Sequence, residues 1–219
     1  MKIQRLSILT SGNLEELQVF YIDILGLIPE VKNPHALSIR AGESILEFKK
    51  SDRADHYHFA FNVSFDDLET TLEELKDSGI NPISFSGSEI IEFPNWKARS
   101  IYFYDPAGNI VEYIGRQEVN PPFAKKPFSI SEVGLALDEI APVVAKIQTT
   151  IPIKKYDGNG LSFAALGDPE GLIILSGTNR NWYPTDRPAL RSTLEAIIEI
   201  EGESFSINQK ENKVDLERS

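Results

Sequence analysis

One pattern recurs along the chain and limits the folds that it can adopt. Gly26-Leu27-Ile28-Pro29 and Gly79-Ile80-Asn81-Pro82 each follow a stretch with apolar residues at helical spacing. Glycine just beyond a helix and proline shortly after it both stop the helix. A weaker third copy has a possible helix cap at Asp138, a helix through Ile147, and then Ile151-Pro152. The spacing predicts repeated copies of one supersecondary unit.

Each copy is predicted to have the order strand, helix and three short strands, that is, βαβββ. The first strands are expected at 2–9, 57–64 and 129–137. The first helix is expected at 13–25, and Asp66 with Glu69 is predicted to form a capping box for the second. The short strands are expected at 28–31, 36–40 and 44–49, at 82–86, 99–104 and 110–114, and at 153–156, 161–166 and 172–176. Residues 192–201 alternate in polarity and predict a strand that opens an unfinished fourth unit.

These units predict an α+β fold with a cupped mixed sheet. Residues 1–117 are expected to form a complete module of two units, 1–55 and 56–117, with a small-molecule pocket between them. Residues 118–127 have little periodicity and contain Pro121, Pro122 and Pro127, so they are interpreted as a linker. Residues 128–219 are expected to form a degenerate second module.

Charge and composition exclude several classes of function. Lys and Arg number 22 against 33 Asp and Glu, and the net charge of −11 disfavours nucleic acids and anionic membranes as partners. Cysteine is absent, which excludes disulfides and thiolate chemistry. No apolar stretch is long enough to span a bilayer, and no signal segment is recognised. A cytoplasmic protein is expected.

Two segments resemble the vicinal oxygen chelate superfamily. One is 14–27, with Phe20-Tyr21 and Leu25-Gly26-Leu27. The other is 99–113, where Asp105-Pro106-Ala107-Gly108-Asn109 leads into Ile110-Val111-Glu112-Tyr113. That superfamily includes glyoxalase I, extradiol dioxygenases, methylmalonyl-CoA epimerase and bleomycin-resistance proteins. The resemblance covers residues 1–117 and continues over 128–201 as a degenerate copy.

The resemblance implies a metal site with one ligand from the first and one from the last strand of each unit. Carried over, these positions are Leu6, Glu47, His58 and Glu112. Leu6 departs from the family pattern because an aliphatic side chain cannot bind a cation, and Gln4 could substitute for it. The remaining Glu47, His58 and Glu112 would suit Zn²⁺, Ni²⁺, Mn²⁺ or Mg²⁺, with Glu47 or Glu112 as the catalytic base. One histidine is too few for ring-cleaving iron chemistry.

A pocket wall is expected around the strand of Glu112. The residues proposed to contact the substrate are Phe93, Trp96, Arg99, Tyr102 and Tyr113. Leu175 is expected at the position in unit three that Glu112 holds in unit two, so the second half should lack a metal site. Trp182 is expected to pack a loop against the second half, and His35 and His56 are expected at the surface.

The sequence is compatible with three functions. The first is a glyoxalase-like lyase or isomerase that uses a divalent metal and a carboxylate base. The alternative is a metal-free ligand-binding protein of the bleomycin-resistance type, which Leu6 favours. The third is an interaction protein, for which the second half would supply a partner surface. A small-molecule ligand and a possible homodimer are expected.

Overall fold

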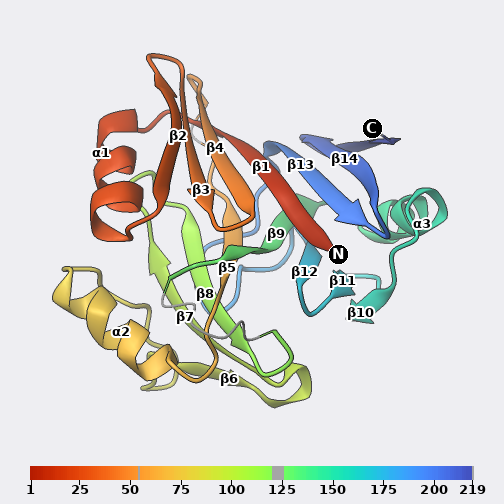
Figure 1. The fold of residues 1–219 in the computed structure, drawn as a ribbon. Coiled ribbons are helices and arrows are strands. Elements are labelled where there is room, and N and C mark those ends of the chain that lie inside the picture. Colours follow the sequence, from red (N-terminus) through yellow and green to blue (C-terminus); the bar gives the residue numbers. More distant parts are fainter. Residues whose placement is uncertain (54, 120–125, 219) are drawn as a thin grey trace.

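The computed structural model describes residues 1–53, 55–119 and 126–218, and it has an α+β fold dominated by one mixed sheet (Figure 1). The described residues form fifteen strands that hydrogen-bond into a single continuous sheet. The predicted fold class is therefore confirmed. The predicted linker, 118–127, falls largely on residues outside the described ranges.

Unit one has the predicted order of elements. Its elements are β1 (Lys2–Thr10), α1 (Leu14–Gln18), the π-helical turn η1 (Val19–Ile24), β2 (Ile28–Asn33), β3 (Ala36–Ala41) and β4 (Ser44–Lys50). The Asn13 side chain caps α1 by accepting a hydrogen bond of 2.9 Å from the amide of Glu15. Gly26 follows the helix with φ +68°, the left-handed conformation that favours glycine.

Unit two differs from the prediction at two places. Its elements are β5 (His58–Val63), α2 (Leu68–Asp77), β6 (Ile91–Phe93), the 3₁₀ turn η2 (Pro94–Trp96), β7 (Ala98–Tyr104) and β8 (Ile110–Arg116). The strand expected at 82–86 is wrong, because this segment has only an isolated bridge between Phe85 and Ser88, and the strand follows at β6. Asp67, rather than Asp66, is the residue at the N-cap of α2.

Unit three and the fourth unit complete the sheet. The elements are β9 (Ser129–Leu137), α3 (Ala141–Thr150), β10 (Lys155–Asp157), β11 (Phe163–Asp168), β12 (Gly171–Gly177), β13 (Thr193–Ile200), β14 (Glu203–Lys210) and β15 (Lys213–Arg218). The N-cap of α3 is Ile140, whereas Asp138 accepts hydrogen bonds from Thr178 and Arg191. The fourth unit is an antiparallel three-stranded meander, as the alternation at 192–201 indicated for its first strand.

The pairing of the units differs from the sequence-based expectation. Strand β1 pairs antiparallel with β13 along most of its length, and β5 pairs antiparallel with β9. In the order of strands β9 lies between β1 and β5. Unit one therefore joins the fourth unit, and unit two joins unit three. The expectation that the sheets of units one and two form one cup is wrong, since β9 separates β1 from β5. The repeat pattern identifies the units without specifying which first strands pair.

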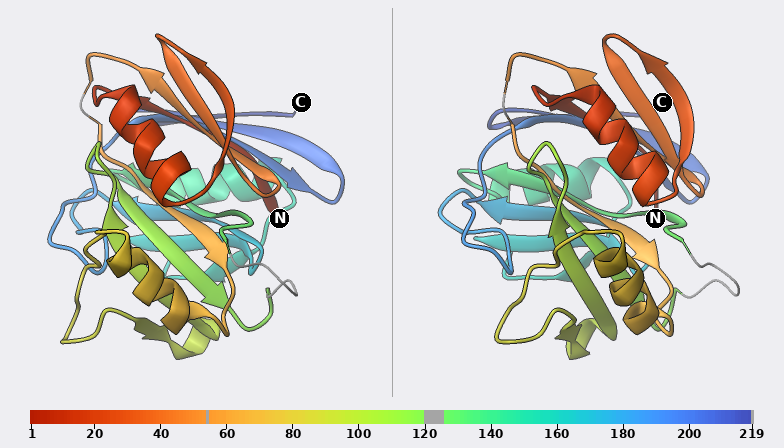
Figure 2. Two further views of the ribbon diagram at one scale, coloured as in Figure 1. Left: turned by 60° about the vertical axis from the view of Figure 1, so that its left-hand side comes forward. Right: turned by 90° about the vertical axis from the view of Figure 1, so that its left-hand side faces the viewer.

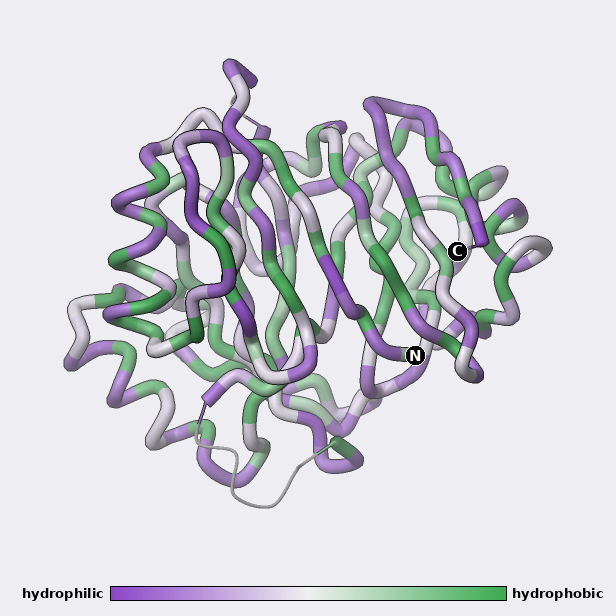
Figure 3. The backbone as a smooth tube through the Cα atoms, turned by 45° about the horizontal axis from the view of Figure 1, so that its top comes forward, coloured by the Kyte–Doolittle hydropathy of each residue, from purple (hydrophilic) through white to green (hydrophobic). Residues whose placement is uncertain are grey.

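Burial follows the strand alternation. Leu194, Ala196 and Ile198 of β13 are buried in the main core, whereas the residues between them are half-buried on the other face. Figure 3 shows the alternation of hydrophilic and hydrophobic residues along the strands of this part of the sheet. Helices α1 and α2 flank units one and two, and α3 lies beside the blue strands of the fourth unit (Figure 2). No helix of the described residues combines the length and the apolar character that crossing a bilayer requires.

Candidate functional site

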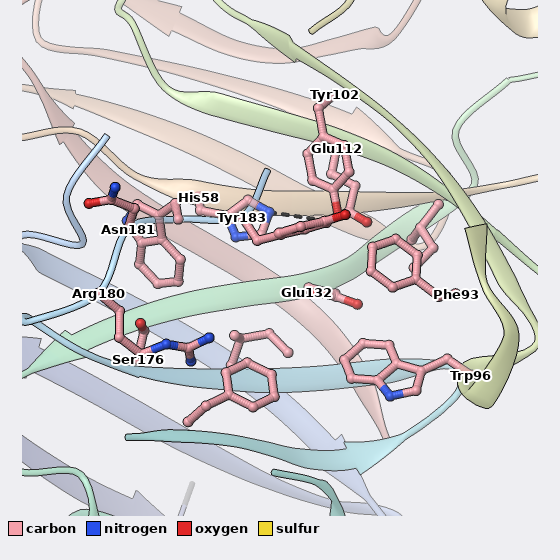
Figure 4. Close-up of a pocket in the computed structure, with 14 residues that line it drawn as sticks. His58, Phe93, Trp96, Tyr102, Glu112, Glu132, Ser176, Arg180, Asn181 and Tyr183 are labelled. Carbon is pink, nitrogen blue, oxygen red and sulfur yellow. Dashed lines mark hydrogen bonds and ion pairs between the residues drawn. The ribbon is translucent and has the colours of Figure 1, made fainter. Parts of the chain in front are cut away.

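An aromatic-walled pocket lies where the strands of unit two meet those of unit three (Figure 4). Its empty space is about 530 Å³ when the open mouth is included. Strands β5, β6, β7, β8, β9, β11 and β12 contribute to it, together with the turn η2 and the loop at 180–183. The aromatic lining residues are Phe93, Trp96, Tyr102, Phe163, Trp182 and Tyr183. The polar lining residues are His58, Glu112, Glu132, Ser176, Arg180 and Asn181.

The first polar feature of the pocket is a buried pair of His58 and Glu112. Parallel pairing of β5 with β8 places Glu112 beside Ala60, two residues from His58. The Nε2 atom of His58 lies 3.1 Å from a carboxylate oxygen of Glu112, and both side chains are less than 10% exposed. Burial acts to raise the pKa of Glu112, but the hydrogen bond and charge of His58 outweigh it, and the pKa lies below its ordinary value.

The second nitrogen of this histidine has no partner. His58 Nδ1 is buried and makes no hydrogen bond with any part of the chain that the structure describes. A buried polar atom without a partner carries a free-energy cost, so such atoms are rare in folded proteins. A bound molecule that donates a hydrogen bond to Nδ1, or accepts one from it, would remove that cost.

The second polar feature is a buried ion pair between Arg116 of β8 and Glu132 of β9. Arg116 is only 1% exposed, and it also donates hydrogen bonds to Ser131 and Asn62. Burial and the nearby charge of Glu112 raise the pKa of Glu132 to about 7, although the positive charge of Arg116 acts in the opposite direction. This network joins β5, β8 and β9 behind the pocket.

The aromatic walls are fixed by packing and by hydrogen bonds. The ring of Trp182 lies 5.2 Å from that of His58, and Gly134 of β9 makes room for it. A Cβ atom at Gly134 would come within 2.7 Å of the Trp182 ring. On the opposite wall, Trp96 Nε1 donates a 2.6 Å hydrogen bond to Asp157. The walls are thus held in place before any ligand enters.

The predicted metal ligands do not come together. Glu47 of β4 accepts hydrogen bonds from Ser7 at 2.7 Å and Ser38 at 3.3 Å, in unit one, and does not line the pocket. Gln4, the possible substitute ligand, donates to Glu199 of β13 at 2.7 Å. No group of three His, Asp or Glu side chains within the described ranges is close enough to hold a metal ion. The predicted trio is wrong because unit one pairs with the fourth unit, which separates Glu47 from His58 and Glu112.

Three of the five predicted substrate contacts are in the pocket. Phe93, Trp96 and Tyr102 line it. Arg99 does not, because it is paired with Glu69 of α2 and lies over the Phe65 ring. Tyr113 does not either, since it is buried in the main core with its ring 5.1 Å from that of Phe103. Alternation along β7 and β8 turns Arg99 and Tyr113 away from the pocket.

Most of the pocket residues that the sequence reasoning missed come from unit three and the loop after it. Glu132 is an acid within an apolar strand, the same signal that identified Glu112, and could have been recognised. Trp182 lines the pocket, so its expected role as loop packing is corrected. Leu175 faces the main core, and its neighbours Ile174 and Ser176 face the pocket. His35 and His56 are exposed, as predicted.

Comparison with known proteins supports the fold. No protein-family model matches the sequence, and no curated protein matches it either. Among solved structures, the chain is similar to a protein of Bacillus subtilis subsp. subtilis str. 168 that is proposed to be a dioxygenase. This match has a TM-score of 0.66 at 13% identity and covers 100% of this chain and 84% of the other. The chain has the vicinal oxygen chelate fold. A glyoxalase I mutant from Zea mays is also similar, with a TM-score of 0.59 at 14% identity over 96% of this chain and 90% of the other.

Within this fold, the residues present do not fit the divalent metal that the resemblance implied. His58 and Glu112 supply two donor groups, and Glu132, the other carboxylate that lines the pocket, is already paired with Arg116. Structural zinc sites use four protein ligands and catalytic zinc sites three. Mg²⁺ is bound mainly by oxygen ligands, and here Glu112 is paired with His58. No step of a reaction is therefore assigned to a metal at this pocket.

Proposed function

We propose that this protein binds a small, planar and largely apolar organic molecule in the pocket between units two and three, without a metal ion. The observation that supports this proposal is the enclosure of the buried His58–Glu112 pair by aromatic walls. Sites for small organic ligands are concave and mostly apolar, with a few convergent polar groups. This is the metal-free alternative of the sequence-based interpretation.

The metal-dependent lyase or isomerase is less well supported. Its proposed base and ligand Glu47 lies in unit one, away from the pocket. The remaining pair could still exchange a proton with a bound molecule, since His58 Nδ1 has no partner among the described residues and Glu112 can orient the ring through Nε2. Proton transfer is therefore a second candidate, and incorporation of solvent deuterium into a bound carbonyl compound would test it. Failure of His58→Asn to reduce that incorporation would rule it out.

The binding proposal can be tested with the fluorescence of the protein itself. The chain has two tryptophans, Trp96 and Trp182, and both line the pocket. Titration with 2-naphthamide, a neutral planar probe, should change their emission in a saturable way. Trp96→Ala should weaken binding about three- to tenfold by removing one aromatic wall. Leu161→Ala is the matched control, because this residue is 74% exposed and outside the pocket.

Treatment with a chelator distinguishes metal-free binding from a metal-dependent lyase or isomerase. Binding of 2-naphthamide should be the same in purified protein and in protein treated with a chelator. Loss of binding after chelation, or full binding by Trp96→Ala, would contradict the proposal.

A further inference from the structure

The pocket contains a positively charged side chain for which the described residues provide no negative partner. Arg180 is half-buried and lines the pocket beside Ser176. Among the ion pairs of the described residues, none involves Arg180. Its guanidinium makes one long hydrogen bond, 3.5 Å from Nη1 to the carbonyl oxygen of Ser162. Most of its donors are therefore available.

The guanidinium is nevertheless held in position. Its Cζ atom lies 5.0 Å from the centre of the Phe163 ring, which forms part of the pocket wall. The backbone of Arg180 is fixed by hydrogen bonds of 3.0 Å to Gly177 and 2.9 Å from Ala189. Figure 4 shows the side chain extending from the margin of the pocket toward its middle. A positioned guanidinium loses little conformational entropy when it binds an anion.

Neither of the two acids that line the pocket is paired with Arg180. Glu112 is paired with His58, and Glu132 is paired with Arg116. Arg187 is the other arginine without a carboxylate partner in the described part of the chain, but it donates to the carbonyl oxygen of Gly108 and lies over the Tyr104 ring. Arg187 lines a different hollow, beside His56 and Pro188, so Arg180 is the one of the two that lines the aromatic-walled pocket, with most of its donors available.

We infer that the ligand carries an oxyanion, such as a carboxylate, which Arg180 binds at the Ser176 side of the pocket. Arginine binds carboxylates through two parallel hydrogen bonds, and its planar fork selects this geometry. The aromatic walls then receive the planar apolar part of the same molecule. This inference rests on the proposed function and adds to it the class of ligand, a planar monoanion.

The test compares two probes of the same shape, 2-naphthoate and its neutral amide 2-naphthamide. Titration calorimetry on the full chain should show that the acid binds about tenfold more tightly than the amide, or better, as expected for a charge-assisted hydrogen bond. Arg180→Gln should remove this preference and leave the affinity for the amide within about threefold. Arg180→Lys should retain part of it, because it keeps the charge and loses the paired geometry.

Arg191→Gln is the control for a general change in charge. Arg191 is partly exposed, pairs with Asp138 and lies outside the pocket, so the preference for the acid should persist. Equal affinity of the two probes for the unaltered protein would overturn the inference while leaving the proposed function intact. Binding of neither probe would overturn both. A preference for the acid that survives Arg180→Gln would also overturn the inference.

Discussion

At the scale of single residues, the pocket places two acids in different electrostatic environments. Glu112 has the imidazole of His58 beside it, and its pKa lies below the ordinary value. Burial and the charge of Glu112 raise the pKa of Glu132 to about 7, although Arg116 opposes this. The two carboxyl groups therefore titrate in separate ranges of pH, and Glu132 changes charge near neutrality.

This difference predicts how stability depends on pH. The pKa of Glu132 is about 7 in the folded chain against 4.5 as its ordinary value, so the folded state holds the proton more tightly. The free energy of unfolding should then fall as pH rises from about 4.5 to about 7, by at most about 3 kcal/mol, and should change no further above that range through this group. Urea unfolding at a series of pH values measures it.

Two variants isolate the contribution of Glu132. Glu132→Gln should remove the fall in stability between about pH 5 and 7. Glu217→Gln, at an exposed position of β15, should leave the profile unchanged. If the Glu132→Gln protein kept the same slope as the unaltered chain, the raised pKa would be refuted.

At the scale of elements, the contact between β8 and β9 depends on buried charge. Arg116 at the end of β8 reaches Ser131 and Glu132 of β9 and Asn62 of β5. Ion pairs that are removed from water stabilise a fold only while both partners remain, since a single buried charge is costly. Loss of either Arg116 or Glu132 is therefore expected to weaken the packing of unit two against unit three.

Arg116→Leu should lower the free energy of unfolding by about 3–5 kcal/mol, because Glu132 would lose its partner. The double variant Arg116→Leu with Glu132→Leu should recover most of that loss. Arg191→Gln, which breaks an exposed pair, should cost less than about 1 kcal/mol. Denaturant unfolding of these three variants and the unaltered chain gives the comparison, and a double variant that is no more stable than Arg116→Leu would contradict the argument.

The sequence predicted individual strands and helices more accurately than it predicted the residues of the site. Alternation and helix-stop signals gave β5, α2 and β12 to within a few residues, because these patterns depend on local chemistry. The strand expected at 82–86 failed, since the segment turns back on itself at Phe85 and Ser88 after one hydrogen bond from Ile83 to Tyr102 of β7. The Glu47 ligand failed for a different reason, since the unit that pairs with unit one is set by long-range strand pairing that no local pattern encodes.

At the scale of the whole molecule, the second half of the chain supplies strands that pair with both units of the first half. Unit three closes the pocket of unit two, and β13 covers the edge of β1. The division at residues 118–127 was predicted from composition, whereas three pairs of strands, β1 with β13, β1 with β9 and β5 with β9, cross it. The division into two modules stays a prediction that an experiment on fragments can decide.

A fragment of residues 1–117 should not fold by itself. It would leave β1 without β13 and β5 without β9, and would expose the apolar residues that those pairs bury. We expect a poorly dispersed amide NMR spectrum for the fragment alone, and native-like dispersion after addition of residues 118–219. A well-folded fragment 1–117 would instead support the division predicted from the sequence.

The pairing of β1 with β13 also has a consequence for synthesis of the protein. Residues 2–10 are made before their antiparallel partner at 193–200, which follows nearly two hundred residues later. Throughout that interval one edge of β1 lacks this partner and can pair with strands of other chains. Units two and three can assemble sooner, because β5 and β9 are closer in sequence. The inner pair of units is therefore expected to form before the outer pair on the nascent chain.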